Sequence, residues 1–144
     1  MPLGVFVASS EIMQVLSFDP FLGHITTFGG HPVSCAAAYA SLKILKEDDI
    51  VDNVEEKASL FKSILSENKN ILEIRNKGLL MAVQLDGFSR VKEVINNCLT
   101  EGLITDWFLF NDAAIRIAPP LIINKDQIEK ACDILNWAIN KTAK

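Results

Sequence analysis

Residues 24–38 read HITTFGGHPVSCAAA and predict a tight glycine-rich turn that leads directly into a helix. Gly29 and Gly30 can adopt backbone angles that other residues avoid, and they let another group approach the chain closely. Pro32 suits the first turn of a helix, and the alanines after it have high helix propensity. Thr27 and the threonine before it precede the expected helix N-terminus, a favourable place to hold an anion. Taken alone, these residues also fit a capped, buried helix that binds nothing, which is the commoner case.

Composition narrows the class of protein. The chain has 144 residues, 49% hydrophobic and 22% charged, which suffices for one domain with a substantial core. A net charge of −4 and a pI near 5.1, without a basic patch, give no reason to expect nucleic acid. No apolar run approaches the roughly 20 residues of a membrane-spanning helix. These properties favour a cytoplasmic protein.

The cysteines and histidines do not suggest a metal site. Cys35, Cys98 and Cys132 are far apart, and an odd, scattered set suits reduced thiols in a cytoplasmic protein. A metal site would need His24 and His31 to converge with Cys35, and the rest of a ligand set is lacking. We expect no metal.

Hydrophobic periodicity predicts an α+β protein: an N-terminal arm, one long buried helix, and a small layer of mostly antiparallel strands covered by helices. The helix expected over residues 32–46 is apolar nearly all round, which predicts its burial. Asn124 with Gln127 resembles a capping box that opens the last helix. The remaining expected helices cover residues 10–16, 49–67 and 89–100, and the expected strands cover residues 3–9, 71–75, 79–85, 103–110 and 113–117, with turns at 76–78 and 111–112.

Three segments, in order along the chain, resemble the class III aminotransferases, which include the ornithine and acetylornithine aminotransferases. The segments are MPLGVFVAS at residues 1–9, TFGGHPVSCAAA at residues 27–38 and IRIAPPL at residues 115–121. The resemblance implies the small C-terminal domain of the type I pyridoxal-phosphate-dependent transferase fold. It also implies that residues 1–30 are a remnant of the large cofactor-binding domain, and that residues 31–144 are the long helix and the small domain.

The resemblance further implies a homodimer that uses pyridoxal 5'-phosphate, with the Schiff-base lysine upstream of Met1. None of the lysines in this chain lies in the family's motif, so we assign no catalytic residue and expect the isolated chain to be inactive. Thr27 matches the threonine that contacts the cofactor phosphate of the neighbouring subunit. From its residues alone, Thr27 would be a hydroxyl in a helix-start turn.

Arg116 matches the family arginine that binds the α-carboxylate of the substrate. A planar guanidinium with five donors suits bidentate capture of a carboxylate. Without the resemblance, an edge strand with Arg116 pointing to solvent is the simpler interpretation. Arg75 is expected to anchor the hairpin, and Trp107 and Phe108 could wall a substrate pocket or belong to the core.

Two functions are therefore open. The first is the C-terminal portion of an aminotransferase that moves an amino group from an ornithine-like or other ω-amino donor to a 2-oxo acid. The second is a stand-alone α+β binding or interaction module without catalysis. The resemblance favours the first, in which this chain supplies binding and orientation while the cofactor acts as electron sink.

Overall fold

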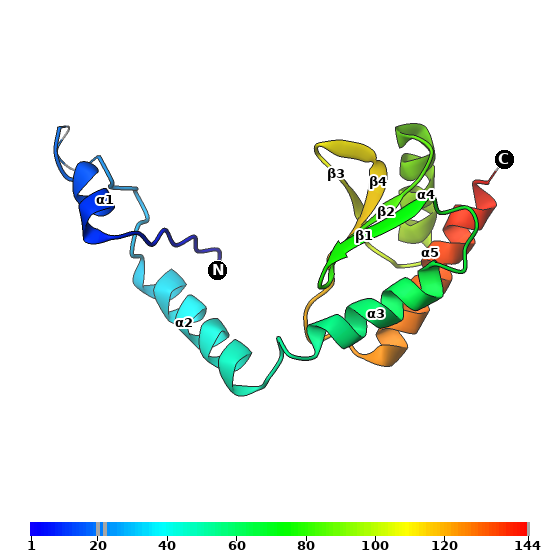
Figure 1. The fold of residues 1–144 in the computed structure, drawn as a ribbon, viewed down its shortest axis with the longest axis horizontal. Helices are drawn as coiled ribbons and strands as arrows, with labels where there is room; N and C mark the ends of the chain where they lie inside the picture. Colours follow the sequence, from blue (N-terminus) through cyan, green and yellow to red (C-terminus); the bar gives the residue numbers. More distant parts are fainter. Residues whose placement is uncertain (20, 22, 144) are drawn as a thin grey trace. The chain divides into compact units, whose positions relative to one another are not determined.

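The computed structural model describes residues 1–19, 21 and 23–143, and the chain divides into two units, Met1–Asp48 and Asp49–Lys144 (Figure 1). The first unit holds helices α1 (Ser10–Val15) and α2 (Pro32–Glu47). The second holds helices α3, α4 and α5 and one sheet. Among the described residues, no helix has both the length and the apolar character that crossing a bilayer requires.

Helix α2 begins where the sequence predicts. Pro32 occupies the first turn, where its missing N–H group has no cost, and His31 is the N-cap residue but makes no side-chain capping bond. The start of α1 is instead capped by the Ser9 hydroxyl, which accepts from the Ile12 N–H.

Two expectations for the first unit are wrong. The expected strand over residues 3–9 forms no strand, because a strand needs a hydrogen-bonding neighbour and the described part of the unit supplies none. The expected burial of the long helix is also wrong, since none of the residues of α2 is buried. Val33, Tyr39 and Leu42 are all more than half exposed. The apolar surface predicted from the sequence is present, but none of the described residues of its own unit buries it.

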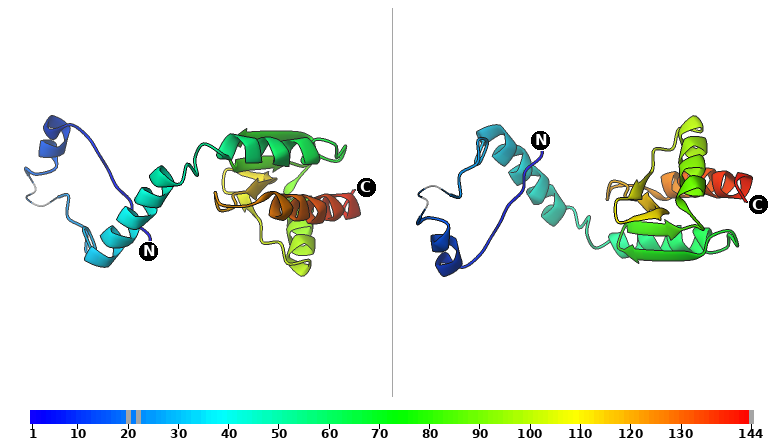
Figure 2. Two further views of the ribbon diagram at one scale, coloured as in Figure 1. Left: turned by 90° about the horizontal axis from the view of Figure 1, so that it is seen from below. Right: turned by 90° about the horizontal axis from the view of Figure 1, so that it is seen from above.

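The second unit is a four-stranded antiparallel sheet with helices on one face, which confirms the predicted α+β class (Figure 2). The strand order is β1-β2-β4-β3, so β4 is an interior strand. The element bounds are α3 (Val54–Leu65), β1 (Glu73–Lys77), β2 (Leu80–Gln84), α4 (Phe88–Thr100), β3 (Asp106–Phe108), β4 (Asn111–Ile117) and α5 (Lys125–Lys141).

The core lies between the sheet and its helices. Alternate residues of the two interior strands point into it, and Met81, Val83 and Ile115 are fully buried there. The helices contribute side chains such as Phe61 of α3 and Ile128 of α5. The opposite face of the sheet carries the residues between these, so the polar and charged positions of the strands share one open surface.

Local signals account for the start of α5 and for the turn between β1 and β2. The capping box predicted at Asn124 is present: its side chain accepts from the Gln127 N–H at 2.9 Å, and Gln127 Oε1 accepts from the Asn124 N–H at 3.0 Å. Strands β1 and β2 are joined by Gly78 and Leu79 rather than by residues 76–78. Gly78 has a φ of +52°, which explains the glycine there.

Candidate substrate-binding and phosphate-binding sites

Arg116 lies in the middle of the sheet and on its open face. Its neighbours along β4 include Ile115, which is fully buried, so the alternation of the strand turns Arg116 to the other side. In register, Arg116 stands between Ala82 of β2 and Asp106 of β3. Its side chain is 44% exposed. The simpler interpretation of an edge strand does not hold, since β4 is paired on both sides.

Asp106, the first residue of β3, and Thr105, which precedes it, contact Arg116. Its Nη2 donates to Asp106 Oδ2 at 2.9 Å, and the side chain of Asp106 is 49% exposed. The other oxygen of this carboxylate, Oδ1, accepts from the Trp107 N–H at 2.8 Å. The Thr105 hydroxyl donates to the carbonyl oxygen of Arg116 at 2.7 Å. The Asp106 carboxylate, itself held by a backbone N–H group, therefore orients the guanidinium of Arg116. The Thr105 hydroxyl holds the backbone of β4 at the same residue.

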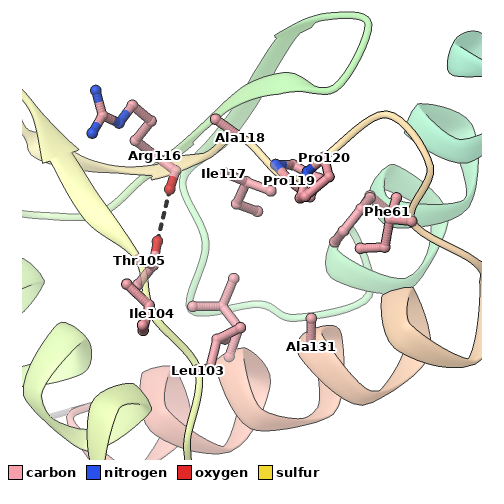
Figure 3. A pocket seen from close by; sticks show the side chains of 12 residues that line it. Phe61, Leu103, Ile104, Thr105, Arg116, Ile117, Ala118, Pro119, Pro120 and Ala131 are labelled. Carbon is pink, nitrogen blue, oxygen red and sulfur yellow. Dashed lines mark hydrogen bonds between the residues drawn. The ribbon is translucent and has the colours of Figure 1, made fainter. Parts of the chain in front are cut away.

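An apolar pocket of about 280 Å³ lies behind the same stretch of β4. It is lined by the end of β4, by the segments before β3 and after β4, and by side chains of α3 and α5 such as Phe61 and Leu135. Figure 3 shows the guanidinium of Arg116 pointing away from this pocket. Arg116 thus borders the pocket, while its guanidinium lies on the open sheet face, which is the candidate site for a carboxylate.

The rest of the open face is held by an amide network. Arg75 Nη2 donates to Gln84 Oε1 at 3.0 Å, and Asn111 Nδ2 donates to the same oxygen at 2.8 Å. Arg75 also pairs with Glu73. The hairpin role expected for Arg75 fits these contacts, because they join β1, β2 and β4 across the face.

Trp107 and Phe108 have different neighbours, and neither belongs to the buried core. Trp107 packs edge-on against Phe88 at the start of α4, with ring centroids 5.5 Å apart, and therefore belongs to the helix side. Phe108 lines a shallow hollow on the open face together with Arg75 and Ala82.

Thr27 lies in the turn that precedes α2. The Gly29 N–H donates to the Thr26 carbonyl at 3.2 Å and closes the turn. A Cβ at Gly29 would stand 2.7 Å from Thr26 Oγ1, so only glycine leaves room for this hydroxyl. Within the described part of the chain, neither threonine hydroxyl makes a hydrogen bond, and both residues are exposed.

These features fit a phosphate group. The N-terminus of α2 has no side-chain cap, so its first N–H groups are unsatisfied and carry the positive end of the helix dipole. Two threonines with exposed side chains precede it in the chain. Among the described residues, His31 Nδ1 is the buried side-chain polar atom without a partner, and it lies at the same helix start. A phosphate would satisfy donors that the chain itself leaves open.

The family model described as aminotransferase class-III matches residues 1–139. The chain belongs to this family. Class III aminotransferases depend on pyridoxal phosphate and act on an amino donor and a keto acid, and the match confirms the resemblance drawn from three short segments.

Solved transaminase structures agree with the fold. An aminotransferase from Bacillus anthracis is 26% identical with a TM-score of 0.79, and the match covers 92% of this chain and 34% of that one. The ornithine aminotransferase from Toxoplasma gondii, described with partial occupancy of PLP at its active site, is 27% identical with a TM-score of 0.78 and coverages of 92% and 32%. A transaminase from the marine bacterium Virgibacillus is 29% identical with a TM-score of 0.81 and coverages of 93% and 34%. The chain spans about a third of the length of these structures.

The sequence suggests Thr27 and Arg116 as site residues but gives no sign of the Asp106 contact. The two predicted residues lie in different units, each of which is described separately. A two-residue turn at 111–112 would place Trp107, not Asp106, opposite Arg116. The observed hairpin turns earlier and contains an irregularity between Trp107 and Phe108, which brings Asp106 into register instead. A shift of one residue exchanges the two faces of a strand.

Proposed function

We propose that this chain forms part of the substrate and cofactor site of a pyridoxal-phosphate-dependent aminotransferase. The amino group moves from an ornithine-like or other ω-amino donor to a 2-oxo acid. The observation that carries the proposal is Arg116, a half-exposed guanidinium in the centre of an open sheet face, within a chain of class III family membership. We further propose that the protein is a cytoplasmic homodimer. The division into a large-domain remnant (1–30) and a small domain (31–144) stays a prediction.

Arg116 is the residue we propose for the α-carboxylate of the substrate. Asp106 contacts only Nη2, and among the described residues Nε and Nη1 make no side-chain hydrogen bond. A guanidinium has five N–H donors, so a second carboxylate can form two parallel bonds on the unused side. Desolvation by the rest of the enzyme would strengthen these bonds.

Thr27 is the residue we propose for the cofactor phosphate, contributed to the neighbouring subunit. The exposed hydroxyl and the uncapped N-terminus of α2 both favour an anion. The cofactor, when bound, supplies the electron sink for the reaction. Thr27 would fix the phosphate end of that group, and Arg116 would fix the carboxylate end of the substrate, so this chain orients the reactants. None of its lysines matches the residue that holds the cofactor covalently.

Replacement of Arg116 tests the proposal. In an enzyme that carries these residues within the complete class III fold, Arg116→Ala should lower kcat/KM for carboxylate-bearing donors by roughly 2–5 kcal/mol of transition-state stabilisation. Arg116→Lys should rescue poorly, because an ammonium cannot reproduce the planar fork. The melting temperature should change little.

The matched control is Arg75→Ala, which removes an arginine from the same open face. Its contacts are within the sheet, so we expect a change in stability rather than in substrate use. Unchanged kinetics with a large loss of stability for Arg116→Ala would show that Arg116 is a structural residue and would contradict the proposal.

An experiment on the isolated chain tests whether any of its own lysines binds the cofactor covalently. We expect that mixing the 144-residue chain with pyridoxal phosphate, followed by borohydride reduction, labels no single lysine stoichiometrically. Peptide mass spectrometry measures the label, and a transaminase assay runs in parallel. Specific labelling of one lysine together with turnover would contradict the binding-and-orientation role.

A further inference from the structure

The ion pair between Asp106 and Arg116 places a carboxylate of the chain itself on the guanidinium proposed for substrate. We propose that Asp106 is a positioning and specificity residue of this site. In the absence of a substrate carboxylate it pairs with the guanidinium of Arg116, and when a substrate is present it competes with the substrate carboxylate for that guanidinium. The inference rests on the proposed function of Arg116. It adds a residue that weakens binding of the substrate carboxylate, whereas Arg116 strengthens it.

The geometry makes Asp106 a fixed partner. Its Oδ1 accepts from the Trp107 N–H at 2.8 Å, so the backbone of β3 holds one oxygen in place. The other oxygen, Oδ2, receives Nη2 of Arg116 at 2.9 Å. Because the two residues are directly opposite in the β3–β4 register, the contact requires no long reach by either side chain. Both side chains are still about half exposed, so solvent and ligands reach the pair.

The ion pair with Asp106 uses only one of the five N–H donors of the guanidinium. Nη2 has two N–H groups, one toward each of the two edges on which a carboxylate can bind in bidentate fashion. Asp106 takes one of them, which leaves an edge for a second carboxylate. That second carboxylate would then approach a negative charge already in contact with Arg116. The repulsion weakens its binding, and it disappears if Asp106 is neutral.

Other groups on the face do not duplicate this effect. Thr105 binds the Arg116 carbonyl and carries no charge. Glu73 is paired with Arg75 on the far side of β2. Asp112, exposed near the start of β4, makes no ion pair with another described residue. It therefore offers a matched control of equal charge on the strand that bears Arg116.

The test titrates 2-oxoglutarate into the 144-residue chain and follows the Arg116 Nε–Hε signal by ¹⁵N NMR at low salt. The assignment comes from the loss of the signal in Arg116→Lys. We expect Asp106→Asn to tighten the apparent binding about 2- to 5-fold, the range that exposed ion pairs support. Asparagine keeps an oxygen for the Trp107 N–H, so the fold is retained. We expect Asp106→Glu, which keeps the charge, to bind as the natural chain does, and Asp112→Asn to have no effect.

The outcomes separate the two proposals. If 2-oxoglutarate shifts the Arg116 signal equally in the natural chain and in Asp106→Asn, the inference is wrong while the role of Arg116 stands. If Asp106→Asn weakens binding, competition is excluded and the inference is again wrong. If no chain shows a shift of the Arg116 signal, the proposed carboxylate role of Arg116 itself fails. A gain in Asp106→Asn, absent in Asp112→Asn, supports the competition.

Discussion

Single glycines show most directly how this chain is constrained at the scale of one residue. Gly78 combines a left-handed φ of +52° with a crowded position, where a Cβ would stand 2.7 Å from Val54 Cγ1. Gly102 has a φ of +82° but open space around it. An alanine at Gly102 would meet only the backbone strain of a positive φ, whereas an alanine at Gly78 would meet that strain and a steric clash.

We expect Gly78→Ala to lower the free energy of unfolding more than Gly102→Ala does. The left-handed conformation costs roughly 1–2 kcal/mol for a residue with a Cβ, and only Gly78 adds a clash with α3. Urea unfolding followed by circular dichroism measures both. Equal losses of unfolding free energy would show that α3 shifts to relieve the clash and that the contact does not affect stability.

The buried thiols give a second prediction at this scale. Burial raises the pKa of Cys98 to about 11 and that of Cys132 to about 12, and the nearby carboxylates of Asp133 and Glu129 add to the second shift. Since the thiolate is the reactive form, both thiols should resist alkylation at pH 8 in the folded chain. Cys35 is exposed and should react at once. A thiol-reactive dye should count one thiol before unfolding and three after.

The same shifts fix the sign of a pH dependence. A folded-state pKa above the unfolded value of about 9 means that the folded chain retains protons that the unfolded chain releases. The stability from these thiols is complete below pH 9 and is lost as the pH rises toward 11–12. Chemical unfolding at pH 7, 9 and 10 checks this, and Cys98→Ala should reduce the slope. A stability that is flat above pH 9 would contradict it.

At the scale of elements, helix α5 is the segment best specified by its own sequence. Asn124→Ala removes the capping acceptor and should cost about 1 kcal/mol of unfolding free energy. Asn96→Ala is the control, since Asn96 is exposed within α4 and alanine has the higher helix propensity there. Thermal or urea unfolding measures both variants. A loss in the control as large as that at Asn124 would remove the support for the capping box.

The elements that sequence reasoning predicted are those with local signals. The capping residues Asn124 and Gln127, and Pro32 at the start of α2, act within a single turn of chain, so the sequence alone reveals them. The failures are non-local. An isolated strand over residues 3–9 depends on a neighbour, and the burial of α2 depends on a surface to cover it. The Asp106–Arg116 pair depends on a hairpin irregularity with no sequence signal that we could identify.

The candidate site likewise has a part that the sequence predicts and a part that it does not. Arg116 and Thr27 could be proposed because they lie in short segments that resemble a known family. Their surroundings could not, because the open sheet face is assembled from four strands whose register must be known to within one residue.

At the scale of the whole molecule, the chain combines a unit that has a core with one that lacks it. Every buried hydrophobic residue of the described chain lies in Asp49–Lys144. In Met1–Asp48, large apolar side chains such as Val5, Phe6 and Phe28 are each at least 70% exposed. Exposed apolar surface of this extent favours association with another surface.

We therefore expect a chain of residues 49–144 to fold as the full chain does but to behave better in solution. Its core is complete, with the sheet and the three helices α3, α4 and α5 present, so its melting temperature should lie within a few degrees of the full chain. The full chain should self-associate as its concentration rises, because residues 1–48 add apolar surface without adding a core. Differential scanning calorimetry measures the transition, and light scattering over a concentration series measures the association. Phe6→Ser with Phe28→Ser in the full chain is the matched control, and should reduce association without changing the transition. A monomeric full chain at all concentrations, or an unfolded 49–144 chain, would contradict this expectation.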